Sequence, residues 1–365
     1  MKDTLTDANF PRTADHRVYH LGLRPGEVAN RIVTVGSPSR AETIARLLDV
    51  SPQPFRLSSE RGFFTITGRY KGVPVSIVSI GMGSPNMDFF VREVRECISG
   101  DMAVIRLGSC GALINVPVGS VVIPKASVAV SRNVDFNFSD PDSCTDPAYR
   151  ISKPVAADPD LHREVHKALE AALPAGSDTN IVTGTVNASA DSFYSSQGRR
   201  TSFPDHNENL IEQLLASSKD LATLEMETFH LFHLAACWGR HTPTGKPTPA
   251  PLTTNPVSPT VHQSTSSNQP ISQVLASSNT VIKAAAAQLV FASRTSQAFI
   301  TPEQVAELEA WSAKGVLEAL KNTPMENNVS NQIFPLSGFL KTCLTTVTEA
   351  PPGGRQRMGV SNELN

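Results

Sequence analysis

The sequence lacks the features of a membrane or secreted protein. No apolar run approaches the ~20 residues that span a bilayer, and residues 1–17 contain no apolar stretch like that of a signal peptide. The five cysteines are odd in number and scattered, which favours reduced thiols over a disulfide framework. We therefore expect a cytoplasmic protein.

The sequence also lacks an excess of charge of one sign. Lys and Arg number 32 against 34 Asp and Glu, so there is no electrostatic signature of a nucleic-acid or membrane-surface partner. The nine histidines include the helically spaced pairs His162/His166 and His230/His233, but no third ligand stands at metal-binding spacing. We expect no nucleic acid, no membrane and no metal among the partners.

Apolar residues make up 40% of the chain, which is enough for a sizeable core. β-branched runs alternate with amphipathic helical stretches, and this order favours a mixed, partly parallel sheet flanked by helices. Ser84 is the expected N-cap of one helix, with Pro85 in its first turn. Strands are predicted at 32–35, 63–70, 73–81, 102–108, 120–130, 180–189 and 284–293, and helices at 41–49, 84–98, 160–172, 207–216 and 302–321, with a strand running into a buried helix at 221–238.

Residues 240–280 interrupt this pattern. They contain seven prolines, many Ser and Thr and no acidic residue, a composition typical of a disordered insertion. The sequence therefore predicts a single domain formed by residues 15–239 and 281–322. Residues 1–14 are expected to form a flexible N-terminus and residues 323–365 a loosely ordered tail.

Residues 36–40, Gly-Ser-Pro-Ser-Arg, connect a predicted strand to a predicted helix. Ser39 and Glu42 have the spacing of a capping box, which predicts that the helix N-terminus is presented here. Free N–H groups at such a terminus bind anions, and the preceding Gly36 lets phosphate approach the backbone. The alternative is an ordinary capped junction that carries a surface arginine, Arg40.

Arg106 interrupts an otherwise apolar strand, Met102–Leu107, and is followed directly by Gly-Ser-Cys-Gly. A buried guanidinium without a partner is costly, so either a carboxylate or a bound anion must neutralise it. The sequence leaves both alternatives open.

Glu225, Met226 and Glu227 follow a short apolar strand, in which residues two apart point to one face. Carboxylates accept hydrogen bonds well from vicinal hydroxyls, so a ribose is a natural partner for both acids. The alternative is a pair of exposed acids at the start of a helix, where the dipole favours them.

These segments resemble, in order and spacing, the bacterial-type nucleoside phosphorylases, and most closely their uridine-specific branch. The resemblance covers about residues 17–322 without 240–280. It implies an α/β, three-layer nucleoside-phosphorylase-like fold with a central mixed, partly barrel-like sheet flanked by helices. Its motifs are YHLGL (19–23), GSPSR (36–40), ERGF (60–63), RLGSCGA (106–112), DSFYSSQGR (191–199), EMET (225–228) and ASRT (292–295).

The resemblance implies a substrate site shared between two copies of the chain, and therefore a homo-oligomer, either a dimer or a hexamer. Arg61 and His20 would each reach into the site of a neighbouring subunit. The residues implied for phosphate are Gly36, Arg40, Arg61, Arg106 and Ser109, and those implied for ribose are His20, Glu225, Met226 and Glu227.

The resemblance also implies a base-binding segment, in which Phe193 stacks on the base while Gln197 and Arg199 bind its polar edge. Purine-specific relatives have an aspartate near the position of Arg294, so an arginine there favours a pyrimidine. The implied activity is phosphorolysis of uridine to uracil and ribose 1-phosphate, with inorganic phosphate as co-substrate and no cofactor. Arg106, Gln197, Arg199 and Arg294 are the implied catalytic residues.

The sequence leaves three alternative functions open. A purine nucleoside phosphorylase is favoured by the GSCG form of residues 108–111. A nucleosidase that uses water is disfavoured because Arg40, Arg61 and Arg106 are all retained. A catalytically idle nucleoside-binding protein is favoured by the insertion and the tail.

Overall fold

A mixed sheet of 11 strands forms the centre of the part of the chain that the computed structural model describes, residues 4–239 and 280–325. A separate two-stranded sheet, β1 (Leu5–Thr6) and β2 (Arg12–Thr13), lies within the segment expected to be flexible. The remaining strands are β3 (Arg31–Val35), β4 (Phe55–Ser58), β5 (Phe64–Tyr70), β6 (Val73–Ser79), β7 (Met102–Ala112), β8 (Val121–Arg132), β9 (Tyr149–Ile151), β10 (Val155–Ala156), β11 (Ile181–Ala190), β12 (Leu221–Glu225) and β13 (Ile282–Ser293).

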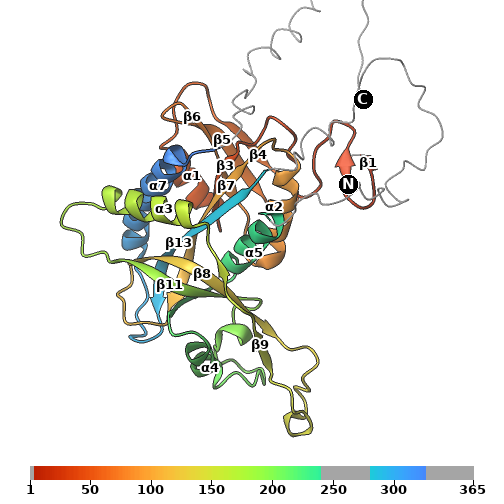
Figure 1. Cartoon of the computed structure of the whole chain (residues 1–365), viewed down its shortest axis with the longest axis vertical. Coiled ribbons are helices and arrows are strands. Elements are labelled where there is room, and N and C mark those ends of the chain that lie inside the picture. The colour runs from red at the N-terminus through yellow and green to blue at the C-terminus, as the bar shows by residue number, and fades with distance from the viewer. Residues whose placement is uncertain (1–3, 240–279, 326–365) are drawn as a thin grey trace, which may run out of the picture. The chain divides into compact units, whose positions relative to one another are not determined.

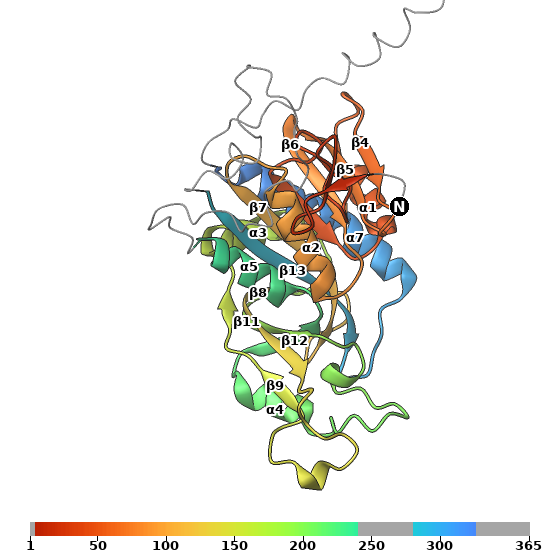
Figure 2. The same cartoon turned by 90° about the vertical axis from the view of Figure 1, so that its right-hand side faces the viewer.

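Helices cover both faces of this sheet, which gives three layers (Figure 1). One group, on the left of Figure 1, is α1 (Pro38–Ala45), α3 (Pro159–Ala172) and α7 (Pro302–Asn322), and the other is α2 (Ser84–Arg95) and α5 (Thr228–Gly239). α4 (Leu210–Ser217) lies near β9, away from these two groups, as Figure 2 also shows. None of the helices in the described ranges is long and apolar enough to cross a membrane.

Part of the sheet closes on itself. β8 pairs with β11, β11 with β12, β12 with β7, β7 with β13 and β13 again with β8. This circuit of five strands is a small barrel, and β3, β6, β5 and β4 extend the sheet from it. The predicted α/β architecture with a mixed, partly barrel-like sheet and flanking helices is confirmed.

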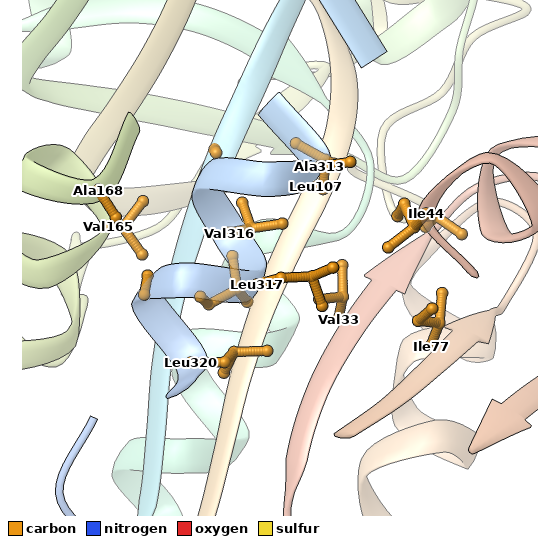
Figure 3. Close-up of a cluster of buried hydrophobic side chains, with 14 of the residues drawn as sticks. Val33, Ile44, Ile77, Leu107, Val165, Ala168, Ala313, Val316, Leu317 and Leu320 are labelled. Carbon is orange, nitrogen blue, oxygen red and sulfur yellow. The ribbon is translucent and has the colours of Figure 1, made fainter. Parts of the chain in front are cut away.

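The main core lies between the sheet and the group of α1, α3 and α7. Figure 3 shows Val316 and Leu317 of α7 between Val165 of α3 and Val33 of β3. α3 and α7 approach closely at Gly315, where an added Cβ would lie 2.7 Å from Cδ2 of Leu169. The spacing of apolar residues that predicted these helices therefore corresponds to their buried faces.

The two predicted helix starts need correction. α1 begins at Pro38 rather than 41, and its N-cap is Ser37, whose Oγ accepts from the Arg40 N–H at 3.3 Å; Ser39 is not the cap. Proline is favoured at the first position of a helix, because it has no N–H that needs a partner. α2 is capped by Gly83 with φ 94°, so Ser84 is its first helical residue.

Lys71 and Gly72 form the turn between β5 and β6. Both have positive φ, 50° and 80°, which a two-residue hairpin connection requires. The carboxylate of Asp49 accepts from both of their N–H groups. The predictions for residues 240–279 and 326–365 lie outside the described residues, and the domain boundaries stay a prediction.

Candidate active site

The site lies where two strands meet end to end on one edge of β7. β13 occupies the other edge of β7 along residues 102–112. β3 pairs in parallel with residues 103–106, and β12 pairs antiparallel with residues 111–112. The carboxyl ends of β3 and β12 therefore converge on residues 107–110, where neither strand pairs with β7. Ligands in α/β proteins bind at such strand ends, because backbone groups there are free of the ladder.

A cavity of about 310 Å³ opens at this convergence. It brings together segments that are far apart in the sequence, from the end of β3 to the residues after β13. The predicted site residues that line it are Gly36, Arg40, Arg106, Ser109, Phe193, Gln197, Arg199, Glu225, Met226 and Glu227. His20, Arg61 and Arg294 do not line it.

Arg106 is buried, and its Nη2 donates to Oε2 of Glu227 at 2.8 Å. Of the two alternatives for its neutralisation, the carboxylate is therefore present. Glu227 also accepts from the N–H of Gly83 at 2.6 Å. Among the described residues, however, none bonds to the Nε or Nη1 atoms of Arg106. Because buried donors are normally satisfied and Arg106 lines the cavity, these two nitrogens are the ones that a bound anion would satisfy.

Arg40 projects from α1 and is also buried. Its Nε donates to Oε1 of Glu309 on α7 at 2.7 Å, and its guanidinium lies 5.5 Å from the ring centre of Phe291. Burial lowers the pKa of Arg40, Glu309 opposes this shift and the positive charge of Arg106 adds to it. Two arginines are thus held near each other on the same side of the cavity, which favours an anion between them.

Other groups of the protein donate hydrogen bonds to both oxygens of the Glu225 carboxylate. Its Oε1 accepts from Asn187 Nδ2 at 2.7 Å and from the Ser189 hydroxyl, and its Oε2 accepts from the N–H groups of Glu227 and Thr228, both at 2.9 Å. It therefore caps the start of α5, but Glu225 and Glu227 are both buried, so they are not the exposed pair of the alternative interpretation. Burial and the charge of Glu227 raise its pKa.

The segment 193–199 also lines the cavity, through Phe193, Gln197 and Arg199. Phe193 is 45% exposed, and the guanidinium of Arg199 lies 4.1 Å from its ring centre. Arg199 Nη2 is 3.4 Å from Oε1 of Gln197, and its buried Nε has no partner in the part of the chain that the structure describes. An aromatic face therefore lies beside an amide and a guanidinium, as a planar polar ring requires.

Arg294 lies behind this segment rather than in the cavity. Its Nη1 donates to the carbonyl of Gln197 at 3.1 Å and its Nη2 to the carbonyl of Gly198 at 3.2 Å. Burial lowers the pKa values of Arg294 and Arg199, and for Arg199 the charge of Arg294 adds to the effect. The two guanidinium groups give this end of the cavity a positive field.

His20 and Arg61 lie elsewhere on the chain. His20 stacks on Phe89 at 3.8 Å between ring centres, and its Nδ1 is 2.6 Å from Oε1 of Glu93. Arg61 bonds to the hydroxyl of Tyr19 and lies over its ring. Neither residue meets the cavity of its own chain.

Several lining residues were not predicted. Met82 and Phe299 are largely exposed at the cavity, 74% and 72%, and Phe291 and Ala292 come from the end of β13. The glycines on either side of Met82 were a usable signal, because both have positive φ and mark an irregular strand end. The full set that was missed is Ser37, Met82, Cys110, Gly111, Leu224, Phe291, Ala292 and Phe299.

Within residues 4–239 and 280–325, no group of three or more His, Cys, Asp or Glu side chains is placed to hold a metal ion. That the protein needs no cofactor stays a prediction.

Comparison with known proteins gives the family. The Phosphorylase superfamily model matches residues 30–242. A uridine phosphorylase of Thermococcus kodakarensis is 33% identical over 245 residues, 66% of this chain and 79% of the relative. A DeoD-type purine nucleoside phosphorylase of Oceanobacillus iheyensis is 30% identical over 224 residues, 60% of this chain and 82% of the relative.

Solved structures agree with these matches. A structure from work on two uridine phosphorylases of the oomycete Phytophthora capsici aligns with a TM-score of 0.73 at 38% identity, and covers 88% of this chain and 100% of its own. A Trypanosoma brucei nucleoside phosphorylase shares the fold, with a TM-score of 0.64 at 21% identity, and covers 86% of this chain and 100% of its own.

The chain therefore belongs to the Phosphorylase superfamily. Its fold is the nucleoside phosphorylase fold that the sequence motifs predicted. Enzymes of this family act on a nucleoside and phosphate.

Proposed function

We propose that the protein catalyses the phosphorolysis of uridine to uracil and ribose 1-phosphate. The observation that carries the proposal is the chemistry of the 193–199 end of the cavity. There the polar groups are the amide of Gln197 and the guanidinium of Arg199, with Arg294 directly behind them. An amide accepts from N3–H and donates to a carbonyl, while a guanidinium donates to a second carbonyl, so the set matches uracil.

The positive field at this end also suits the leaving group. As the bond from C1′ to N1 breaks, its electron pair moves onto uracil and the negative charge spreads to O2 and O4. Donors fixed near those oxygens stabilise that charge more in the transition state than in the ground state. Arg199 and Gln197 are the donors in our proposal, and Arg294 adds charge from behind.

Phosphate would bind beside Arg106, whose Nε and Nη1 have no partner among the described residues, and Arg40 and Ser109 line the same cavity. One phosphate oxygen attacks C1′ as uracil leaves, which forms ribose 1-phosphate. The negative charge of phosphate stabilises the positive charge that develops on the sugar. Met226 and Glu227, which line the cavity, are the candidates for the ribose contact.

We further propose that the active protein is a cytoplasmic homo-oligomer. His20 and Arg61 lie outside the cavity of their own chain, and a second copy is what would bring them to a site. Mixing an Arg61→Ala chain with an Arg106→Ala chain tests this. Recovery of activity in the mixture supports sharing of the site. Two inactive variants that stay inactive when they are co-assembled argue against it.

The substrate is tested by incubating the protein with uridine or inosine, each with and without phosphate, and measuring the free base. Release of uracil that requires phosphate is expected. Release of hypoxanthine alone would instead make the protein a purine nucleoside phosphorylase, to which it is also similar. Release without phosphate would indicate a nucleosidase, and binding without release an inactive nucleoside-binding protein.

A further inference from the structure

The segment that faces the base is a tight turn whose backbone is held from outside. Ser195–Gln197 form one turn of 3₁₀ helix, and Gly198 follows in the left-handed region with φ 61°. An added Cβ at Gly198 would lie 2.9 Å from Cγ1 of Ile211 on α4. The turn therefore packs directly against α4, and its backbone path requires glycine at that position.

Two side chains bond the carbonyl groups of this turn. Asn207 Nδ2 donates to the carbonyl of Ser195 at 2.9 Å and to that of Arg199 at 3.0 Å. Arg294 donates to the carbonyls of Gln197 and Gly198. Four carbonyls of the turn are thus fixed by two residues that do not line the cavity.

Asn207 is itself held firmly. It is 4% exposed, and the neighbouring Asp205 accepts at its carbonyl from the hydroxyl of Tyr149 at 2.7 Å. The carboxylate of Asp205 pairs with Arg132 at 2.9 Å. A buried side chain on an anchored segment transmits its position to the groups that it bonds.

We propose that Asn207 is a positioning residue for base recognition. It bonds the first and last carbonyls of the turn, and so it sets the directions in which Gln197 and Arg199 leave the backbone. The inference rests on the proposed function only in that a base occupies this end of the cavity. Arg294 bonds two of the three intervening carbonyls, those of Gln197 and Gly198, and has the same positioning role.

The test compares Asn207→Asp and Asn207→Ala with the native protein. Asp has nearly the same shape as Asn but cannot donate, and its carboxylate repels the two carbonyl oxygens. Asn209→Ala is the matched control, because Asn209 is exposed and its side chain makes no capping hydrogen bond at the start of α4. Thermal unfolding and kinetics with varied nucleoside and varied phosphate are measured for all four proteins.

We expect both Asn207 variants to lower kcat/KM for the nucleoside by about tenfold or more, equal to about 1.4 kcal/mol. The KM for phosphate should stay within about twofold, because the hydrogen bonds described for the side chains of Arg40 and Arg106 go to Glu309, Leu107 and Glu227 and not to the turn. The Asn209→Ala control should match the native protein. This difference between the two substrates is what a merely structural residue would not produce.

Other results would overturn the proposal. Folded Asn207 variants with native kinetics, or with equal losses for nucleoside and phosphate, would show that the turn does not depend on this residue. Unfolding of both variants would make Asn207 a stability residue. The kinetics are measured with whichever nucleoside the native protein cleaves, so a failure of uridine with the native protein rejects the proposed function and not the role of Asn207.

Discussion

The pair formed by Arg106 and Glu227 offers the sharpest test of the phosphate site. The two side chains are 4% and 5% exposed. Replacing Arg106 by Met therefore leaves a buried carboxylate whose one remaining partner among the described residues is the N–H of Gly83. Removing one member of a buried ion pair costs about 3–5 kcal/mol. For domains of about 150–250 residues, each kcal/mol of lost stability lowers the Tm by about 2–4 °C.

The second substitution separates stability from phosphate binding. Glu227→Gln in the Arg106→Met background removes the stranded charge and keeps an acceptor for Gly83. The double variant should therefore recover to within about 1.5 kcal/mol of the native free energy of unfolding. It should not recover phosphate binding, because the free Nε and Nη1 donors of Arg106 are gone.

Thermal unfolding at increasing phosphate concentration measures both effects, and needs no nucleoside. The native protein should gain about 2.7 kcal/mol when phosphate is present at 100 times its Kd. The double variant should gain nothing at the same concentration. A double variant that phosphate stabilises as strongly as the native protein would refute the role of Arg106. A single variant as stable as the native protein would refute the energetics of the ion pair.

Three further predictions concern other parts of the molecule. Gln197→Ala should lower kcat/KM for uridine by about 10- to 100-fold and leave the KM for phosphate unchanged, as steady-state kinetics would show; an equal loss for both substrates would contradict the assignment. Burial acts to raise the pKa of Glu318, but hydrogen bonds from Lys71, Lys321 and Tyr70 outweigh it and lower the pKa to about 2. Because the folded pKa is depressed, the stabilisation is present above pH 4.5 and is lost as pH falls toward 2; acid titration of Glu318→Gln should lack this part of the stability loss. Gly315→Ala should lower stability by about 1–3 kcal/mol although alanine favours helix, because its Cβ would overlap Leu169; an unchanged or higher Tm would show that α3 and α7 can move apart.

The sequence predicted the sheet and the burial of Arg106 well, for a local reason. A charged residue in an apolar strand is informative because the strand must be buried, and Arg106 is indeed buried in β7. The same argument could not predict which residue pairs with Arg106. Glu227 is 121 residues away and meets Arg106 only because β12 and β7 are neighbours in the sheet.

The roles of Glu225 and Arg294 show which features of the site could not be predicted from local sequence patterns. Alternation along a strand predicts that Glu225 and Glu227 share a face. It does not predict that the carboxylate of Glu225 accepts hydrogen bonds from backbone N–H groups at the start of α5. In the same way, the sequence alone shows that Arg294 directly follows the strand β13. Its bonds to the carbonyls of Gln197 and Gly198 depend on how two distant segments pack. Both corrections come from tertiary contacts that no short pattern encodes.

The convergence of strands on β7 has a consequence for how the protein matures. β3, β12 and β13 come from residues 31–35, 221–225 and 282–293, and the cavity exists only after all three have joined β7. Pairings of such large sequence separation are slow to form. A newly made chain therefore gains the ability to hold substrate at a late step, and phosphate added during refolding will select the finished molecule over its precursors.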